Sequence, residues 1–395
     1  MHCQRAGFND TRRHHAGVAH FDCAAIIGVI EMNDSTEIRT MLSDAATRLF
    51  TGHVSQKMLN AAKQDGWSAA LWNELEQAEL PLVGVPEDAG GAGGSLSDAA
   101  SVLRIAARHA APVPLAETAL AGWLLSSAGL KVPRGPLTIG PVLDETLAIV
   151  KVGAAWRVSG TLKRVPFARV AKQLVLLADS GQGLMVAAVD TTQCRITPAR
   201  NLASEPRDDV VLENITALAA APAGAGVTRD SLHARGALLR AVQIGGALEH
   251  ALYLACEYAT QRVQFGRKIA QFQAIQQELA RCGGEVAAAV AAGLSAAGVV
   301  ERLATDYSAK ATHQMLMAVA AAKIRAADAA REAVAIAHQV HGAIGVTDEY
   351  ALHHVTLRAL AWREEFGNEA YWSMKLGQTM QEAGADAYWA VLSAA

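Results

Sequence analysis

The chain has 395 residues and a formal net charge of -3, with 51% hydrophobic and 18% charged side chains, a length that allows two or three units with shared cores. The near balance of charge leaves no large basic field, so nucleic acid is not an expected partner. The five cysteines are scattered and form no CxxC pair. The sequence therefore predicts neither a zinc or other metal site nor a disulfide framework, and it favours a reducing, cytoplasmic location.

The first residues carry basic side chains and then a weakly apolar run, a pattern that also suits a signal peptide. His20 and Asp22 interrupt that run, and no small-residue cleavage site follows it. From Met32 onward the sequence changes to helix-capping chemistry and an amphipathic pattern. We therefore interpret Met32 as the natural start and residues 1–31 as a non-native or disordered extension.

Residues 32–132 are predicted to form an N-terminal helical domain. Apolar residues from Leu42 to Leu49 recur at helical spacing. A glycine-rich break, PEDAGGAGGS at Pro86–Ser95, separates them from a further helix. This break lacks the Lys-Ser/Thr pair of a phosphate loop, so it is a weak signal for a nucleotide fingerprint.

Residues 133–222 change to the period of β-strands. Short β-rich runs are separated by Gly, Asp, Ser and Pro; they read AWRVSG, KQLVLLA, GLMVAAVD and DDVVLENI. They lack the regular intervening helices of a parallel βαβ sheet. The pattern predicts a small antiparallel barrel or sandwich.

Residues 229–395 are helical and rich in alanine. A long helix is predicted over 231–262, and further helices are predicted over 268–281, 285–305, 308–341 and 348–363. Short loops favour a four-helix bundle. The uncharged run Val286–Val300 is shorter than the roughly 20 apolar residues of a spanning helix, so we expect a packed bundle helix and no membrane span. The expected fold is mainly α with a small β-domain between two helical regions.

Two stretches of the bundle resemble motifs of the acyl-CoA dehydrogenase family. RVQFGRKIAQFQ is similar to R-x-x-F-G-x-x-[IL]-x-x-[FH]-Q, with matches at Arg262, Phe265, Gly266, Ile269, Phe272 and Gln273. QVHGAIGVTDEY is similar to Q-x-x-G-G-x-G-[FY]-x-x-E-Y, with matches at Gln339, Gly342, Gly345, Glu349 and Tyr350. VPEDAGGAGGS resembles the family's P-E-x-[YF]-G-G-x-G loop, with Ala89 in place of the aromatic. The resemblance covers essentially all of residues 32–395.

The resemblance implies an FAD-dependent enzyme that oxidises an acyl-CoA thioester between Cα and Cβ and passes electrons to an electron-transfer flavoprotein. It implies a homo- or heterotetramer, because these motifs hold FAD across a subunit boundary. The implied cofactor residues are Arg262, Phe265, Gln273, Gln339, Gly342 and Gly345. Arg262 is suited to phosphate oxygens, and the glycines allow close approach of backbone N–H groups. Each residue also has a structural reading, such as an ion pair of Arg262 with Glu257 or a helix C-cap at the glycines.

The family's catalytic base is harder to place in this chain. The family commonly has a glutamate in E-G-T, and the corresponding stretch here, WREEFGNEAYW, has Phe366 at that position and Glu365 one residue earlier. Other members place the base in the long helix, where this chain has Gly236. Glu365 is the candidate base, through a small shift of the turn that follows it. Its structural alternative is a solvated acidic helix end.

The β-region also departs from the family. The T-E-P-x-A-G-S-D segment is missing, and Pro166-Phe167 replaces the Trp-Ile pair whose aromatic faces the flavin. Phe167 is therefore a candidate for the flavin face or, equally, a core aromatic. Three functions stay open. The chain is an active, divergent dehydrogenase, or a non-catalytic subunit that completes a partner's FAD site, or another flavin oxidase or monooxygenase on the same fold.

Overall fold

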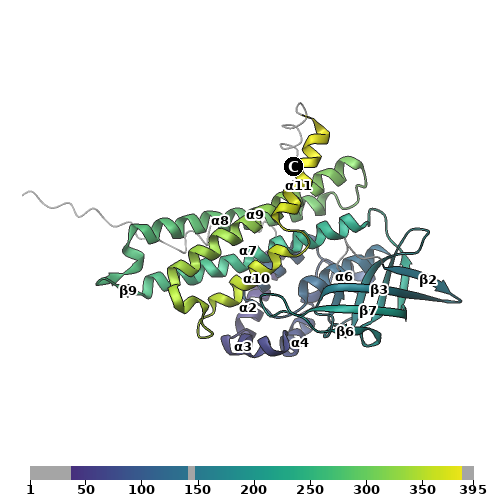
Figure 1. The fold of residues 1–395 in the computed structure, drawn as a ribbon, viewed down its shortest axis with the longest axis horizontal. Helices are drawn as coiled ribbons and strands as arrows, with labels where there is room; N and C mark the ends of the chain where they lie inside the picture. The colour runs from purple at the N-terminus through teal and green to yellow at the C-terminus, as the bar shows by residue number, and fades with distance from the viewer. Residues whose placement is uncertain (1–36, 141–146, 385–395) are drawn as a thin grey trace, which may run out of the picture.

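Helices make up most of the described chain. A sheet domain lies at one end of the molecule (Figure 1) and, in chain order, between the N-terminal helices and the C-terminal helices. The computed structural model describes residues 37–140 and 147–384. The interpretation of residues 1–31 as an extension lies outside these ranges. Within them, the predicted fold class is confirmed: an N-terminal helical region, a sheet domain and a C-terminal helical bundle follow one another.

From residue 37 onward, the N-terminal region contains five α-helices: α2 (Glu37–His53), α3 (Gln56–Asp65), α4 (Ala69–Gln77), α5 (Leu96–Arg108) and α6 (Leu115–Ser127). Serine residues cap three of them, because the side chains of Ser55, Ser68 and Ser95 each accept a backbone N–H of the first turn. The glycine-rich break between α4 and α5 contains a short 3-10 helix at Glu87–Ala89. In this break the Ala89 carbonyl oxygen accepts from the backbone N–H of Val132, which follows α6, at 2.8 Å.

The sheet domain is one eight-stranded sheet. Its strands are β1 (Leu137–Ile139), β2 (Ala148–Val152), β3 (Ala155–Pro166), β4 (Gln173–Asp179), β5 (Leu184–Asp190), β6 (Arg195–Thr197), β7 (Arg207–Thr216) and β8 (Ala219–Pro222). The order is β6-β7-β3-β2-β4-β5-β8, with β1 on β4. The four predicted runs are β3, β4, β5 and β7. The expected antiparallel pairing needs one correction, because β4 pairs in parallel with both β1 and β2.

The bundle consists of α7 (Arg229–Gln261), α8 (Gln273–Arg302), α9 (Ala309–His341), α10 (Leu352–Glu364) and α11 (Glu369–Ala383). The predicted break between residues 281 and 285 is wrong, because α8 runs through Gly283 and Gly284 without interruption. Each glycine weakens a helix by about 1 kcal/mol. Gly283 is buried in the bundle, so tertiary packing overrides the local preference.

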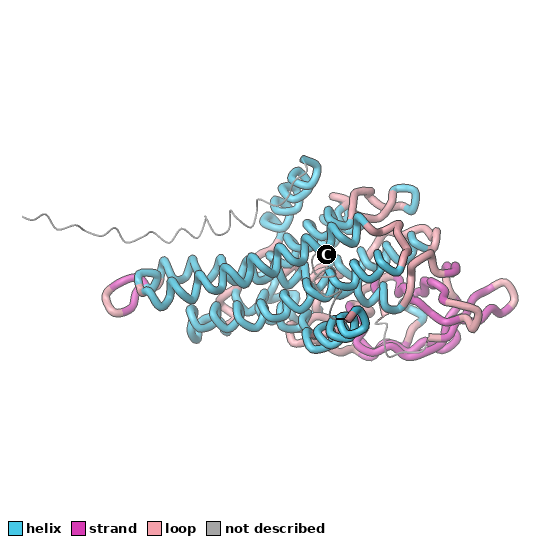
Figure 2. The backbone as a smooth tube through the Cα atoms, turned by 90° about the horizontal axis from the view of Figure 1, so that it is seen from above, coloured by secondary structure: helices cyan, strands magenta, loops and turns pink. Residues whose placement is uncertain are grey.

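The long helices α7, α8 and α9 lie side by side, and both views show this arrangement (Figures 1 and 2). Among the described residues, α8 is long and apolar enough to cross a membrane by length and composition alone. Half of its most apolar window is buried. The core helix of a soluble bundle passes the same test.

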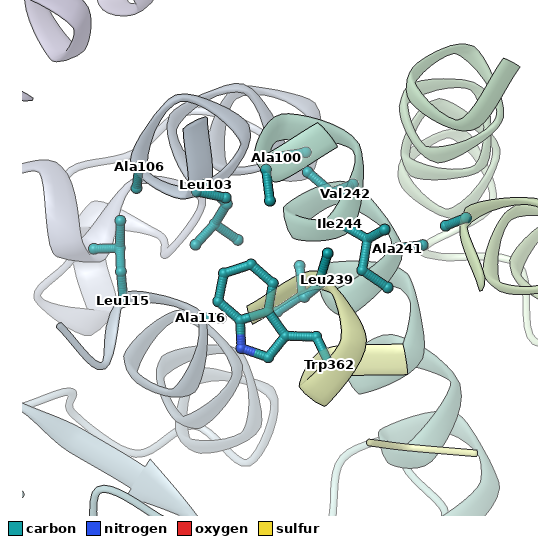
Figure 3. Close-up of a cluster of buried hydrophobic side chains, with 14 of the residues drawn as sticks. Ala100, Leu103, Ala106, Leu115, Ala116, Leu239, Ala241, Val242, Ile244 and Trp362 are labelled. Carbon is teal, nitrogen blue, oxygen red and sulfur yellow. The ribbon is translucent and has the colours of Figure 1, made fainter. Parts of the chain in front are cut away.

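A shared core joins the N-terminal helices to the bundle (Figure 3). The indole of Trp362 on α10 lies among apolar side chains of α5, α6 and α7, which include Leu103, Leu115, Ala116 and Leu239. Burial of each large apolar side chain stabilises the fold by about 1.5–3 kcal/mol. This core fixes α6, α7 and α10 relative to one another, and these three helices surround the site described below.

The contact between α5 and α7 depends on a glycine. A β-carbon on Gly246 would lie 2.0 Å from the backbone carbonyl oxygen of Arg104. Because backbone cannot rotate away, we expect Gly246→Ala to lower the free energy of unfolding by roughly 3 kcal/mol. Gly284→Ala is the matched control, because Gly284 is also in a helix but has nothing within 4 Å of that position. The control should be neutral or stabilising by up to about 1 kcal/mol in denaturant unfolding. Equal midpoints for the two variants would contradict the prediction.

Candidate functional site

The first bundle motif forms a β-hairpin at the end of α7. Two short strands, β9 (Val263–Gln264) and β10 (Arg267–Lys268), pair across a two-residue turn at Phe265 and Gly266. Both turn residues have positive φ, 52° and 79°, which suits a tight hairpin but strains a phenylalanine. The Phe265 side chain is 93% exposed. An exposed aromatic on a strained backbone marks this hairpin tip as a contact site.

Arg262 connects α7 to this hairpin and has no ion pair or side-chain hydrogen bond to any residue in the described ranges. The alternative ion pair between Arg262 and Glu257 is absent from the described residues. The Glu257 carboxylate instead accepts a hydrogen bond from the Gln261 amide at 3.2 Å. Gln273 is exposed at the start of α8. The hairpin therefore presents a guanidinium and an amide that are free for a ligand.

The second motif follows the end of α9 and lies beside the end of α7, from which the hairpin continues. Gly342 ends α9 with a φ of 64°, and the 3-10 helix η5 (Gly342–Val346) follows. Tyr258, in the last turns of α7, stacks on His341 with ring centroids 4.7 Å apart. This contact joins the ends of α7 and α9, so both motifs belong to one surface.

The glutamine and the two glycines of the second motif differ in their exposure to solvent. Gln339 is exposed on the last turn of α9, and Gly342 is exposed beside it. Gly345 is buried, and a β-carbon there would lie 3.1 Å from the Leu352 side chain. Gly342 therefore offers its backbone to a ligand, whereas Gly345 allows close packing of η5 against α10.

Glu365 lies far from this surface and is held by two arginines. Its carboxylate accepts from Arg207 at 2.7 and 3.1 Å and faces Arg240 at 2.7 Å. Burial alone would raise the pKa of Glu365, but Arg207 and Arg240 outweigh burial and lower the pKa to about 2. A carboxylate with so low a pKa has little affinity for a substrate proton. The role of base stays a prediction for this residue.

The turn after Glu365 brings together the two sequence positions at which the family places its base. Phe366 and Gly367 have φ of 55° and 82°. The Phe366 ring lies against Gly236, where a β-carbon would be 2.4 Å from the ring. Both family base positions thus face each other and carry no acid. The remaining cavity between α6 and α7 has a volume of about 10 Å³, which is the space of one water.

Phe167 and Glu365, two of the predicted site residues, are brought together by an arginine that the sequence did not single out. Phe167 is 2% exposed, and its ring centroid lies 5.6 Å from the Arg207 guanidinium. The same guanidinium bonds to Glu365 and, at 3.1 Å, to Glu205. Arg207 therefore occupies the space between the predicted flavin-facing ring and the predicted base.

A buried network extends this contact through three regions of the chain. Arg240 of α7 also pairs with Glu117 of α6 at 2.5 Å. Glu205 accepts from Arg358 at 3.2 Å and from the Trp362 indole at 3.0 Å, both on α10. All of these charged groups are nearly inaccessible to solvent. Buried pairs of this kind are costly to break, because the remaining charge is left without a partner.

The two groups of predicted site residues are far apart in one chain. Arg240 and Arg262 are 22 residues apart along α7, which corresponds to about 33 Å of helix. Figure 1 shows the hairpin at one end of the bundle and the sheet at the other. The exposed cation, amides and glycine backbone at the hairpin end fit a dinucleotide pyrophosphate. At the sheet end, the Arg207 guanidinium lies between Phe167 and Glu365.

Comparisons with known proteins agree with the predicted resemblance. The sequence models described as "Acyl-CoA dehydrogenase, N-terminal domain" and "Acyl-CoA dehydrogenase, C-terminal domain" match residues 36–131 and 223–380. The chain is 30% identical to acyl-CoA dehydrogenase IpdE2 of Mycolicibacterium smegmatis over 330 residues, which are 82% of this chain and 93% of that protein.

Solved structures have the same fold. A variant of the Tcur3481-Tcur3483 steroid ACAD is 26% identical with a TM-score of 0.77, over 88% of this chain and 98% of that one. The ChsE4-ChsE5 complex from Mycobacterium tuberculosis gives 22% identity and a TM-score of 0.79, over 89% of this chain and 99% of that one.

Proposed function

This chain belongs to the acyl-CoA dehydrogenase family, whose cofactor is FAD, and we propose that it is the non-catalytic subunit of a heteromeric member. In this proposal the hairpin and the end of α9 complete the FAD site of a partner subunit, and the partner supplies the catalytic base. The complex oxidises an acyl-CoA between Cα and Cβ. FAD supplies the hydride acceptor, and a soluble electron-transfer flavoprotein receives the electrons.

The observation that carries this proposal is the position of Arg207. Its guanidinium lies 5.6 Å from the Phe167 ring centroid and 2.7 Å from the Glu365 carboxylate. A flavin ring between Phe167 and Glu365 would have to displace Arg207 and leave two charges buried without partners. The Phe366 ring on Gly236 likewise replaces both acids that the family uses. The chain's own site is therefore closed to the cofactor ring and to an acyl group.

The residues at the hairpin end have defined tasks in this proposal. Arg262 makes charge-assisted hydrogen bonds to the pyrophosphate oxygens of the partner's FAD. Gln273 and Gln339 offer donors and acceptors to the ribose and adenine edges. Gly342 lets its backbone approach the dinucleotide. Phe265 inserts an apolar ring beside the cofactor and excludes water there.

The relatives support a heteromer with a bulky substrate. One similar structure is a complex named ChsE4-ChsE5, and another is named a steroid ACAD with two components, Tcur3481 and Tcur3483. We therefore propose a heterotetramer that acts on a steroid-derived acyl-CoA. A ring system of that size needs more space than the cavity of about 10 Å³ in this chain, so the acyl group belongs in the partner's pocket.

One observation favours the alternative, a self-sufficient dehydrogenase with Glu365 as base. Its side chain is 19% exposed, and it directly precedes Phe366 at the family's base position. A shift of the turn would turn it toward the pocket. That shift would break its bonds to Arg207 and Arg240, so we rank this function second.

The visible spectrum of the purified chain separates the two functions. Expressed alone, the chain is expected to be colourless and to stay so after incubation with FAD. The tagged chain isolated from its native cells should co-purify with a second family member and show a flavin spectrum that a steroid acyl-CoA bleaches. A flavin spectrum in the isolated chain, bleached by an acyl-CoA, would exclude the non-catalytic role.

A further inference from the structure

We infer that Lys323 is a positioning residue that holds the turn 365–367 in place and thereby keeps the Phe366 ring against Gly236. Lys323 lies on α9, which packs against α10. It belongs to none of the three stretches that resemble family motifs. Its side chain is 0% exposed, which is rare for a lysine and calls for a specific set of partners.

The Lys323 ammonium caps the C-terminus of α10. Its Nζ donates to the carbonyl oxygens of Trp362 at 2.8 Å, Arg363 at 2.9 Å and Glu365 at 2.9 Å. The last carbonyls of a helix have no partner within the helix and form the negative end of its dipole. The three N–H donors of the ammonium equal the three carbonyl acceptors in number. Lys323 therefore supplies the hydrogen bonds that water would make at an exposed helix end.

The turn that follows is strained and needs such support. Phe366 has a φ of 55°, a conformation that is unfavourable for a side chain with a β-carbon. The Trp372 indole fixes the Phe366 carbonyl oxygen from the other side at 2.9 Å. Strained residues persist only where their surroundings determine them. Lys323 and Trp372 hold the two ends of the turn, and the ring between them is directed at Gly236.

The charge of Lys323 gives this contact a testable pH dependence. Burial lowers the pKa of Lys323 from 10.5 to about 7, and Glu365 opposes that shift. The other charged groups that face it are Glu364 at the end of α10, Glu369 of α11, and Arg240 and His233 of α7. Burial holds the pKa of His233 at about 4, and carboxylates and guanidinium groups do not ordinarily change charge between pH 6 and 9.

The direction of this pH dependence follows from the number of N–H donors that the Lys323 amine carries. Below pH 7 the protonated amine donates three hydrogen bonds to the carbonyls, whereas the neutral amine above pH 7 has two N–H donors. The turn should therefore loosen as pH rises through about 7. His233, whose pKa burial lowers to about 4, stays neutral in this window, so the change reports on Lys323.

Hydrogen exchange of the full chain, read by mass spectrometry, tests this inference. In Lys323→Met we expect the amides of residues 364–368 to exchange at least tenfold faster than in the wild type, with α8 and β4 unchanged. In the wild type the same amides should lose protection between pH 6 and 9, after correction for the intrinsic exchange rate. Lys323→Gln keeps two donors and no charge, so it should show a smaller increase that is independent of pH. Lys310→Met, an exposed lysine on the same helix, is the matched control.

Two results would overturn the inference: unchanged exchange at residues 364–368, or a uniform increase throughout the chain, which would indicate a general loss of stability. If Lys323→Met does not fold, the pH profile of Lys323→Gln decides. By holding the Phe366 ring against Gly236, Lys323 would also keep an acyl group out of this subunit. That consequence rests on the proposed function. The exchange test needs neither FAD nor a partner, so flavin binding by the isolated chain would remove the proposed function and leave the role of Lys323 standing.

Discussion

Replacing Arg262 by alanine is expected to reduce the FAD content of the proposed heteromeric complex by tenfold or more. The Arg262 guanidinium is exposed and has no ion pair within the described residues, so its removal should not disturb the fold. A hydrogen bond to a charged group contributes about 1.5–3 kcal/mol, which corresponds to roughly a 10- to 150-fold change in affinity. The measurement is the ratio of flavin to protein absorbance in complexes isolated with the tagged chain.

Arg331→Ala is the control for this variant, because Arg331 is an exposed arginine on α9 whose ion pairs are with Asp328 and Glu332 of the same helix. Complexes with that variant should keep their full flavin content. If Arg262→Ala complexes also kept it, Arg262 would have a structural role and the hairpin would not contact the cofactor.

The Glu365→Gln variant should lose stability without losing the reaction. The amide cannot balance the charges of Arg207 and Arg240, which are 4% and 2% exposed. Breaking a buried ion pair costs about 3–5 kcal/mol, so a large decrease in the free energy of unfolding is expected. In the assembled complex at a temperature where the variant is folded, turnover should stay within about twofold of the wild type, since in the proposed heteromer the partner supplies the base.

Glu364→Gln is the matched control, because the Glu364 side chain is 58% exposed, its ion pair with Arg363 is as long as 3.9 Å, and its hydrogen bond from Asn368 is exposed. Its stability should change by less than about 0.5 kcal/mol. Loss of turnover in folded, flavin-loaded Glu365→Gln complexes, with normal turnover in Glu364→Gln, would instead identify Glu365 as the base and overturn the non-catalytic role.

The same carboxylate predicts how the protein responds to acid. The pKa of Glu365 is lowered from 4.5 to about 2, so its contribution to stability is complete above pH 4.5 and is lost as pH falls toward 2. Each unit corresponds to about 1.4 kcal/mol, and the loss over this window is about 3 kcal/mol. Glu365→Gln should lack this part of the acid transition.

The order of domains and the hairpin end of the site could be predicted from sequence, because they depend on local spacing. Arg262, Phe265 and Gln339 belong to motifs whose spacing is specific, and the change from helical to β period marks the sheet domain. The sequence also showed that Gly236 and Phe366 stand at the two positions where members of the family have the glutamate base. Their direct contact could not be predicted, because it joins residues 130 positions apart (366 − 236).

The ion-pair network could not be predicted, because its members carry no local pattern. Arg207 is a single arginine at the start of a strand, and Lys323 is one lysine in an alanine-rich helix. Each would ordinarily be assigned to a solvated face. The break expected between residues 281 and 285 was wrong for a related reason: helix propensity is local, whereas the packing that overrides it comes from α7 and α9.

The arginine between Phe167 and Glu365 has a consequence for stoichiometry. In the proposed assembly, this chain contributes its hairpin to the FAD site of the partner. It binds no flavin of its own, because Arg207 lies where the flavin ring would be. An assembly with equal numbers of this chain and its partner would then hold half as many flavins as polypeptides. A titration of the flavin-free complex with FAD should reach its end point at one equivalent per pair of chains, and the mass of protein per flavin would be about twice that of a homomeric relative.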